Sequence, residues 1–309
     1  MIVDRLSVAA EVASAVAAGR PVVALESTLI SHGLPHPANL DVARASEAAV
    51  RESGAVPATV AIRDGRLLVG LGAADLEALA TAPAGSVRKA ARPSLATALA
   101  AGGWAATTVS ATMIAAHAAG IRVFATGGIG GVHRGALGGR SPSLDISSDL
   151  EELSRTPMAV VCAGPKAILD VTATLEYLET RGVPVVTIGQ VDLPGFYARS
   201  SGIGSPQVAA SVGEAARIAA IHLDLGLGGL LLCVPVPEAE ALPGDVARDA
   251  VERAIAGAES AGVSGPALTP WLLARIATIT EGASIRANTA LIENNARVAG
   301  RVAAALATS

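Results

Sequence analysis

Two polar residues stand directly after apolar runs and could carry acid–base or nucleophilic chemistry. Glu26 follows the run Val22–Leu25, and Lys166 follows Met158–Ala163 after a Gly-Pro dipeptide. Both runs have the composition of buried strands, so we expect each side chain at a strand end, partly removed from water. Burial favours a protonated carboxyl group and a neutral amine, which would suit Glu26 to donate a proton and Lys166 to form an imine. The alternatives are a glutamate that stabilises a turn and a lysine that extends to solvent.

A glycine-rich stretch follows a third apolar run, Ile121–Ala125. It reads Thr126-Gly127-Gly128-Ile129-Gly130-Gly131 and leads to His133 and Arg134. Glycines let main-chain N–H groups approach a ligand closely, and such concave arrangements attract anions. The stretch therefore predicts a phosphate site, with a glycine-rich turn that binds nothing as the alternative. A satisfied structural histidine is the alternative for His133.

A helix start is predicted shortly afterwards, beyond a second Gly/Ser/Pro-rich segment, Gly138–Ser143. Ser148-Asp149-Leu150-Glu151 has the spacing of a capping box, and Asp145 and Ser147 stand just before it. The free N–H groups of a helix start favour a phosphate. Asp145 could hold Mg²⁺ or Mn²⁺ largely through waters, because a single carboxylate leaves most coordination positions open. It could equally stabilise the loop.

Two further residues have side chains that could bind a polar ligand. Lys89, in the basic segment Val87–Pro93, could neutralise a phosphate or bind a sugar hydroxyl, or could be a solvated surface charge. Asn288, near the start of the last predicted helix, offers both a donor and an acceptor to the amide edge of a base such as uracil, although a polar residue there needs no ligand.

Cys162 and Cys233 lie in apolar runs and are expected to be small buried hydrophobic residues.

The elements that must position these residues alternate along the chain. Predicted strands are Val22–Leu25, Thr59–Arg63, Leu67–Leu71, Thr107–Ser110, Ile121–Ala125, Met158–Ala163, Val183–Ile188 and Gly229–Val234. Predicted helices are Val8–Ala18, Asn39–Ser53, Ala74–Ala80, Thr112–Ala119, Ala167–Thr180, Val208–Leu225, Gly244–Ala261, Pro270–Thr280 (capped by Thr269) and Ile285–Ala305. Asp64-Gly65 joins two of the strands as a hairpin, so the sheet should be mixed. We predict one large domain over residues 1–309, a three-layer α/β/α fold with a mostly helical C-terminal part.

Composition restricts the class of function. The chain has 309 residues, of which 51% are hydrophobic, 16% charged and 2% aromatic, with a net charge of −4. This argues against a nucleic-acid binder, which would need a basic face or stacking aromatics. Apolar runs are too short to span a membrane, and the first residues, with Asp4 and Glu11, read as a helix rather than a signal peptide. We therefore expect a cytoplasmic protein that binds a small molecule.

Longer motifs resemble the pseudouridine-5′-phosphate glycosidase family, also called indigoidine synthase A-like. They are VVALEST from Val22 with SHGLPHP after it, GAVPATVAI from Gly54, FATGGIGGVHRGA from Phe124, DISSDLEEL from Asp145, VVCAGPKAILD from Val160, LEYLETRGVPV from Leu175, the VPVPE turn and NNARVA from Asn294. These motifs follow the family's order and spacing over essentially the whole chain.

The resemblance implies a reversible reaction in which pseudouridine 5′-phosphate and water give uracil and ribose 5-phosphate. It also implies a homotrimer that uses a divalent metal, usually Mn²⁺. Its implied catalytic pair is Glu26 as proton donor and Lys166 as the amine that forms an imine with sugar C1′. The other implied roles are Asp145 for the metal, Lys89 and the Val109 main chain for substrate contact, Ser147, Ser148 and Asp149 for the pocket lining, Thr126 and His133 near the phosphate, and Asn288 facing the base.

Such a mechanism suits a C–C glycosidic bond, which has no heteroatom leaving group. An imine at C1′ supplies an electron sink, so an amine and an acid are both needed, and the sequence offers both. Three segments depart from the family pattern: Ala90–Ser94 in place of a serine, paired arginines and an aspartate, the loop His133–Asp145 with extra Gly, Arg, Ser and Pro residues, and Gly189–Asp192.

These segments do not include Glu26 or Lys166, so the imine chemistry is still expected. The identity of the base that is released, or of the carbon nucleophile that is accepted, is left open. One alternative is a C-glycosynthase that joins ribose 5-phosphate to another carbon nucleophile to make a C-nucleoside or C-glycoside. The others are a phosphosugar-binding protein without catalysis and a class I aldolase acting on a phosphosugar.

Overall fold

The computed structural model describes residues 2–138, 142–263, 265 and 268–308. Its strands form where short apolar or β-branched runs stand between turn residues. Their bounds are β1 Leu6–Val8, β2 Val22–Leu25, β3 Val56–Arg63, β4 Arg66–Val69, β5 Arg88–Ala90, β6 Trp104–Thr107, β7 Val123–Ala125, β8 Val132–His133, β9 Ala159–Cys162, β10 Leu169–Asp170, β11 Val185–Ile188, β12 Gln207–Ala209 and β13 Leu230–Cys233.

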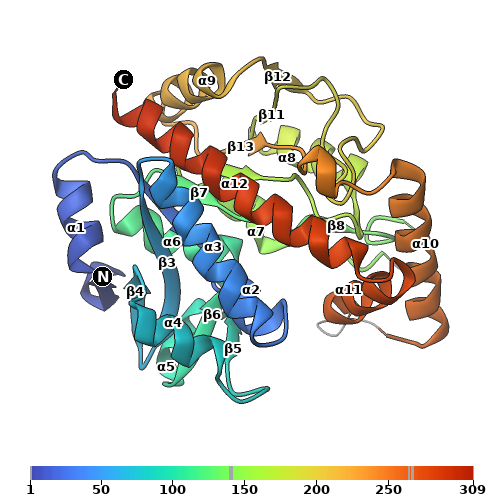
Figure 1. The fold of residues 1–309 in the computed structure, drawn as a ribbon, viewed down its shortest axis with the longest axis horizontal. Coiled ribbons are helices and arrows are strands. Elements are labelled where there is room, and N and C mark those ends of the chain that lie inside the picture. Colours follow the sequence, from blue (N-terminus) through green and yellow to red (C-terminus); the bar gives the residue numbers. More distant parts are fainter. Residues whose placement is uncertain (1, 139–141, 264, 266–267, 309) are drawn as a thin grey trace.

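Eleven of these strands pair into one sheet (Figure 1). Its main path runs β1-β4-β3-β2-β7-β9-β13-β11-β12, while β6 pairs with β3 and β5 pairs with β6. Strand β3 is antiparallel to β4 and β6, and the other pairs of this sheet are parallel. The predicted hairpin and the predicted mixed sheet are both confirmed. Strands β8 and β10 form a separate antiparallel pair.

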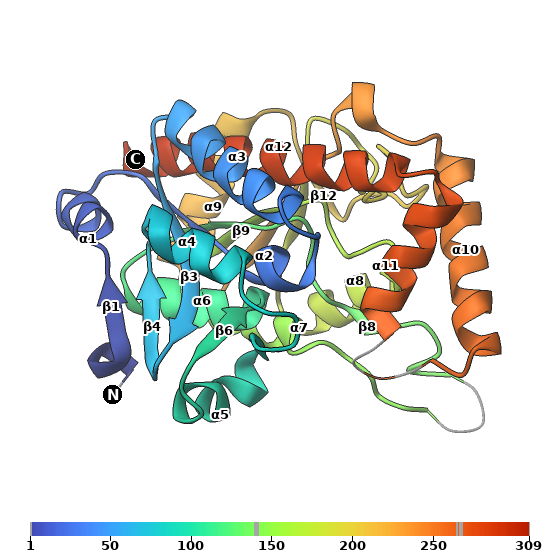
Figure 2. The same ribbon diagram turned by 60° about the horizontal axis from the view of Figure 1, so that its bottom comes forward.

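Helices cover both faces of the sheet. Their bounds are α1 Ala10–Ala17, α2 Thr28–His32, α3 Ala38–Glu52, α4 Ala73–Ala80, α5 Leu95–Ala100, α6 Val109–Ala118, α7 Ser148–Leu153, α8 Val171–Thr180, α9 Val212–Asp224, α10 Gly244–Ser260, α11 Leu268–Ile279 and α12 Ala283–Ala307. Helices α3, α9 and α12 pack on one face, and α1, α6, α7 and α8 pack on the other. The predicted three-layer α/β/α arrangement is therefore confirmed, and α10 and α11 pack together beside it (Figure 2).

The central strands divide their side chains between the two helical layers. In β2, Val22 and Ala24 join the cluster under α1 and α6, while Val23 and Leu25 join the cluster under α3 and α12. Cys162 and Cys233 are fully buried on adjacent strands, as expected of small hydrophobic residues. Because both faces of these strands are buried, their sequences are continuously apolar, and the first polar residue after each strand lies at its end.

Strands β2, β7 and β9 are parallel neighbours, which brings their carboxyl ends to one edge of the sheet. Glu26 follows β2, Thr126 follows β7, and Gly164-Pro165-Lys166 follows β9. These three loops therefore meet at the edge where open α/β sheets bind ligands.

Several predicted element boundaries are wrong. Strand β3 begins at Val56 rather than Thr59, because Val56 and Pro57 pair with β2, and Val8 pairs with β4 as part of β1 instead of starting the first helix. The predicted strand Thr107–Ser110 ends at Thr107, because α6 begins at Val109, three residues before the predicted start at Thr112. The helix predicted from Ala167 begins at Val171, because Leu169–Asp170 pair with β8 and Asp170 accepts from the Ala173 N–H. The helix predicted from Val208 begins at Val212, after Val208 pairs with β11.

Local assignments also change at four places. The N-cap of α7 is Ser147, whose side chain accepts from the Asp149 N–H at 3.3 Å, rather than Ser148. Thr28–His32, which were not predicted as a helix, form α2, and the basic segment around Lys89 contains β5. Thr269 lies inside α11 instead of capping it. Of the segment Gly138–Ser143, residues 139–141 lie outside the described residues.

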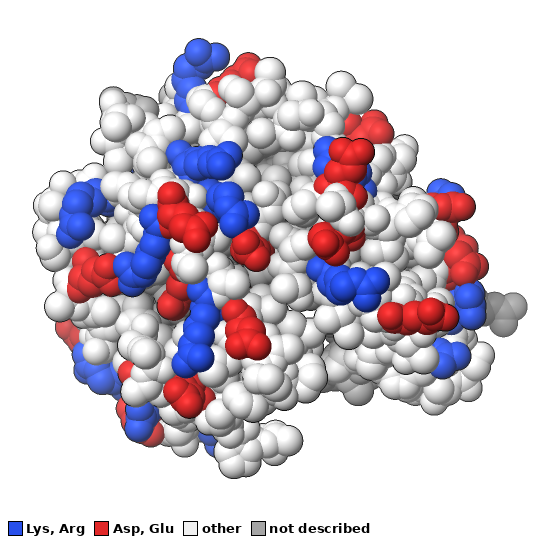
Figure 3. All heavy atoms as spheres, viewed as in Figure 1, with Lys and Arg blue, Asp and Glu red and all other residues white. Residues whose placement is uncertain are grey.

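Acidic and basic side chains intermingle on the face that carries α3 and α12 (Figure 3). Several pair with each other, including Arg51 with Glu11 at 2.6 Å and Arg297 with Glu293 at 2.7 Å. Over the described ranges, every helix is too short or too polar to cross a lipid bilayer.

Candidate active site

Two adjoining cavities open at the carboxyl ends of β2, β7 and β9. The larger, of about 320 Å³, is lined mainly by apolar residues of α2, α11 and α12, such as Leu29, Leu273 and Ile292, and we call it the apolar cavity. The smaller, of about 160 Å³, is lined by residues at the starts of α6 and α7 and is called the polar cavity. Both cavities are lined by Glu26, Thr28, Lys89, Lys166 and Thr269. The predicted acid and the predicted amine thus lie where the two cavities join.

Glu26 is held at this junction by a hydroxyl group. Thr126 Oγ1 donates a hydrogen bond to Glu26 Oε1. Burial raises the pKa of Glu26, while the Lys166 ammonium and the Thr126 hydroxyl offset part of that rise. With a raised pKa, the carboxyl group stays protonated at higher pH than an exposed glutamate does, so it is suited to act as a general acid.

Lys166 lies on a loop that is tied to the glycine-rich stretch. The main-chain N–H of Lys166 donates to the Ile129 carbonyl at 3.1 Å, and the main-chain N–H of Ile129 donates to the Gly164 carbonyl at 3.1 Å. A Cβ on Gly128 would lie 2.9 Å from that same carbonyl oxygen and 2.6 Å from the Phe196 ring, so only glycine allows the two loops to approach this closely. The glycines therefore position the lysine.

The glycine-rich stretch was predicted to cradle a phosphate with its N–H groups, and several of those groups are already occupied. The Gly130 N–H donates to Asp149 Oδ2 at 3.0 Å, and the Thr126 N–H donates to the Val161 carbonyl at 3.0 Å. Just beyond the stretch, the Val132 N–H donates to Thr174 Oγ1 at 3.0 Å. Asp149 Oδ1 accepts from the Ser110 N–H at 3.0 Å. Asp149 thus joins the glycine stretch to α6, and it also lines the polar cavity.

The polar cavity collects most of the residues that were expected to bind substrate. Besides Lys89 and Lys166 it is lined by Val109, His133, Ser147, Ser148 and Asp149. Thr126 and Asn288 line the apolar cavity instead, so Thr126 and His133, which the resemblance put together, face different cavities. The site therefore has a hydroxyl- and cation-lined end and an apolar end, with Glu26 and Lys166 between them.

Lys89 and Lys166 are the only two lysines in the sequence; every other residue counted as Lys or Arg is arginine. Both line both cavities. Burial and the Lys166 ammonium lower the pKa of Lys89. The scarcity of lysine was a signal available in the sequence, and it would have singled out Lys89 as well as Lys166.

His32 is a lining residue that the sequence did not single out. It lies at the end of α2 in the wall of the apolar cavity. Burial and the Lys89 ammonium lower the pKa of His32, so its imidazole favours the neutral form. In the sequence, His32 stood out only as part of the SHGLPHP motif that follows Glu26.

Asp145 lies at the edge of the polar end of the site. Its carboxylate is half exposed, and Asp145 Oδ2 is 3.9 Å from Nδ1 of His133. Among the described residues, no three His, Cys, Asp or Glu side chains gather closely enough to enclose a metal ion. This environment fits a divalent cation that keeps most of its water shell and binds one carboxylate.

The match to known proteins extends over the whole chain. Residues 11–305 match the family model described as indigoidine synthase A like protein. The chain belongs to the indigoidine synthase A-like family. Two similar curated members are named pseudouridine-5′-phosphate glycosidase: one from Sorangium cellulosum is 54% identical, covering 99% of this chain and 95% of that protein. The other, from Paracoccus denitrificans, is 52% identical, covering 98% of this chain and 99% of that protein.

Solved structures of the family share the fold. The prealnumycin C-glycosynthase AlnA, in complex with ribulose 5-phosphate, superposes with a TM-score of 0.89 at 40% identity, covering 98% of this chain and 97% of that one. An indigoidine synthase A-like protein from Thermotoga maritima superposes with a TM-score of 0.85 at 33% identity, covering 98% of this chain and 96% of that one. The family thus includes members named for breaking a glycosidic bond and a member named for making one.

Proposed function

We propose that this protein catalyses the reversible cleavage of the C–C glycosidic bond of pseudouridine 5′-phosphate, giving uracil and ribose 5-phosphate. The observation that carries the proposal is the meeting of Glu26 and Lys166 at the junction of an apolar and a polar cavity. The full-length similarity to proteins named pseudouridine-5′-phosphate glycosidase supports the same substrate.

The two cavities suit the two ends of that substrate. The phosphate would lie in the polar cavity with Lys89, His133 and the Ser147 and Ser148 hydroxyls, because cations and hydroxyl donors bind phosphate oxygens. The uracil would lie in the apolar cavity, where Asn288 can meet its amide edge. This orientation brings C1′ of the sugar to Lys166 and Glu26.

The proposed reaction has two bond-breaking steps. Lys166 attacks C1′ as the free amine while Glu26 donates a proton to the ring oxygen, and the C1′–O4′ bond breaks. The attack leaves a protonated secondary amine, which returns one proton to the Glu26 carboxylate. The nitrogen lone pair then forms a C=N bond to C1′ as the C1′–C5 bond to uracil breaks. The electron pair of that bond goes to C5, which takes up the proton held by Glu26. Water hydrolyses the imine, and this releases ribose 5-phosphate and restores the amine.

We further propose that Asp145 holds a hydrated Mn²⁺ or another divalent cation, which would supply positive charge near the phosphate. A homotrimer in the cytoplasm is the assembly and location we propose for the protein. The exposed Asp145 carboxylate supports the metal proposal, and the two free buried cysteines fit a reducing compartment.

The first test measures uracil released from pseudouridine 5′-phosphate by the wild type and by Lys166→Ala, each with and without Mn²⁺. We expect the substitution to abolish turnover while the circular dichroism spectrum and unfolding temperature stay close to those of the wild type. Near-zero turnover by the wild type, with ribose 5-phosphate binding intact, would reject the glycosidase.

Borohydride trapping can identify which lysine forms the imine, because the sequence contains only two lysines. After incubation with ribose 5-phosphate, we expect a covalent adduct on the wild type and on Lys89→Ala, and none on Lys166→Ala. An adduct that survives in Lys166→Ala and disappears in Lys89→Ala would reverse the assignment. The absence of any adduct on the wild type would favour a phosphosugar-binding protein without catalysis.

The structural similarity to the prealnumycin C-glycosynthase favours one alternative: a C-glycosynthase that joins ribose 5-phosphate to another carbon nucleophile. The same lysine and acid would act in the bond-forming direction. Trapping of the ribose 5-phosphate imine without uracil exchange would support it. Product analysis by NMR separates both reactions from that of a class I aldolase, which would cleave a bond within the sugar chain.

A further inference from the structure

Two walls of the polar cavity come from distant parts of the sequence. One wall is β5 with the residues after it, which bring Lys89 and Ala91 to the cavity. The other is the start of α7, which brings Ser147 and Ser148. Because Lys89 and the serine hydroxyls would bind the same phosphate, their separation must be fixed.

An ion pair joins these two walls behind the cavity. Arg92 Nε donates to Glu152 Oε2, and Thr156 Oγ1 donates to Glu152 Oε1. The Glu152 side chain is only 1% exposed and that of Arg92 is 37% exposed. Only the Glu152 carboxylate of this pair is buried, so its charge depends on Arg92 and Thr156 for compensation, and the contact is suited to fix geometry.

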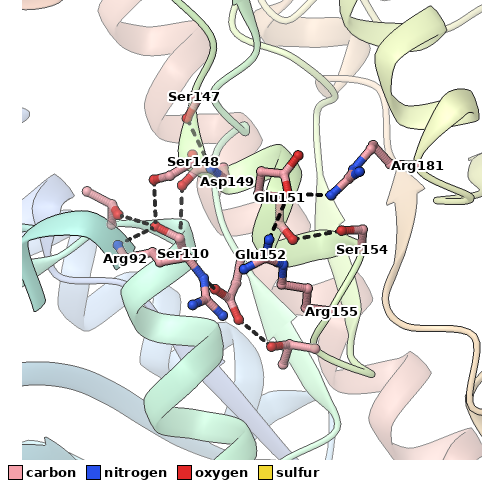
Figure 4. Close-up of polar contacts among 12 residues, drawn as sticks. Arg92, Ser110, Ser147, Ser148, Asp149, Glu151, Glu152, Ser154, Arg155 and Arg181 are labelled. Carbon is pink, nitrogen blue, oxygen red and sulfur yellow. Dashed lines mark hydrogen bonds and ion pairs between the residues drawn. The ribbon is translucent and has the colours of Figure 1, made fainter.

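The main chain of Arg92 continues the connection to the cavity (Figure 4). Its N–H donates to Ser110 Oγ at 3.1 Å, and Ser110 Oγ lies 3.3 Å from Ser148 Oγ. The Ser110 N–H donates to Asp149 at 3.0 Å. Arg92 is therefore bonded through its side chain to the body of α7 and through its main chain to the residues that face the cavity.

We infer that Arg92 and Glu152 are positioning residues that set the distance between Lys89 and the hydroxyl-lined start of α7, and thereby the affinity for the phosphate of the substrate. Neither is among the described residues that line the two cavities, so both act through their neighbours. This inference rests on the proposed function, since it assigns the phosphate to the polar cavity. Glu26 and Lys166 lie on other loops, after β2 and β9, so we expect them to keep their positions when the pair is broken.

The main variant is Glu152→Gln. The amide keeps the shape of the side chain and can still hydrogen-bond to Thr156, but it carries no negative charge to hold the Arg92 guanidinium, so the ion pair is lost. We expect KM for pseudouridine 5′-phosphate, and the dissociation constant for ribose 5-phosphate measured by calorimetry, to rise about tenfold, roughly 1.4 kcal/mol. We expect kcat to change less than about threefold, since the acid and the amine stay in place.

Glu151→Gln is the matched control, because it removes the same charge from the next residue of α7. The Glu151 carboxylate accepts from Tyr177 of α8 at 2.6 Å and bonds to Arg155 and Arg181. Figure 4 shows Glu151 with these two arginines, away from Arg92. We expect its KM to match the wild type even if its unfolding temperature falls. Arg92→Met combined with Glu152→Gln removes both charges, and its KM should be no higher than that of the worse single variant.

An equal rise in KM for Glu151→Gln, or an unchanged KM and dissociation constant in Glu152→Gln, would overturn the inference. The calorimetric arm does not depend on turnover. A wild type that binds ribose 5-phosphate without releasing uracil would therefore reject the proposed reaction and still leave the positioning role open to the same comparison.

Discussion

The Glu26 carboxyl group is controlled by burial, by the Lys166 ammonium and by one hydroxyl, that of Thr126. Removing the hydroxyl in Thr126→Val withdraws a hydrogen bond that stabilises the charged form, so the pKa of Glu26 should rise further. A general acid must be protonated to act, and activity falls as pH increases through its pKa. We therefore expect the falling limb of the kcat–pH profile to move to higher pH.

Thr126→Ser provides the control for this residue, because it keeps a hydroxyl that can donate to Glu26. Its falling limb should stay at the wild-type pH. A falling limb that does not move in Thr126→Val, or that moves to lower pH, would show that Glu26 is not the group whose deprotonation ends activity.

The glycine stretch and α7 approach each other so closely that one added methyl group should separate them. A Cβ on Gly130 would lie 2.2 Å from Ser147 Oγ and 2.9 Å from Asp149 Oδ2. We expect Gly130→Ala to lower the free energy of unfolding by about 1–3 kcal/mol, as overpacking usually does. Because the same movement displaces the N-cap of α7 and the Asp149 bridge, activity should fall at least about tenfold.

Urea unfolding and steady-state kinetics measure both effects. Gly244→Ala, at the first residue of α10, is the matched substitution, since a Cβ there meets no atom within 4 Å. It should leave both stability and activity close to those of the wild type. Full activity in a destabilised Gly130→Ala would mean that the α7 start does not contribute to catalysis.

Helices and strands that begin or end at residues with a clear local pattern could be predicted from the sequence. Strands that form only by pairing with residues far away in the sequence could not. The continuous apolar runs of β2, β7 and β9 identify buried parallel strands. Glu26 comes just after the end of β2, and Lys166 comes a few residues after the end of β9. Strand β10 could not be predicted, because Leu169–Asp170 become a strand only by pairing with Val132–His133. Thr108 was misassigned since β-branched residues suit both a strand and a helix start.

The same distinction applies to the site. The acid, the amine and the two serines at the start of α7 were predictable from strand-end and helix-start patterns, and the structure brings them together. His32 was not predictable, because it reaches the apolar cavity only through α2, a helix of 5 residues with no sequence signal of its own. The Arg92–Glu152 pair depends on a contact between positions 60 residues apart, which no local pattern indicates.

At the scale of the whole molecule, α12 links the end of the chain to the active-site loops. This 25-residue helix packs along α3 and covers β7, β2 and β9. Asn295 Nδ2 on it donates to the Thr126 carbonyl at 2.9 Å and to the Gly127 carbonyl at 3.3 Å. The position of α12 on α3 therefore also fixes the loop that holds Glu26 in place.

Gly300 sets that position, because a Cβ there would lie 2.5 Å from Ser53 Cβ and 3.2 Å from the Val50 carbonyl oxygen of α3. We expect Gly300→Ala to move α12 away from α3, to cost about 1–3 kcal/mol of stability, and to weaken ribose 5-phosphate binding a few-fold through Asn295. Arg301→Ala, an exposed neighbour on the same helix, should change stability by less than about 0.5 kcal/mol. Thermal unfolding followed by calorimetric titration measures both quantities. An unchanged dissociation constant in a destabilised Gly300→Ala would show that the active-site loops hold their geometry independently of the packing between α12 and α3.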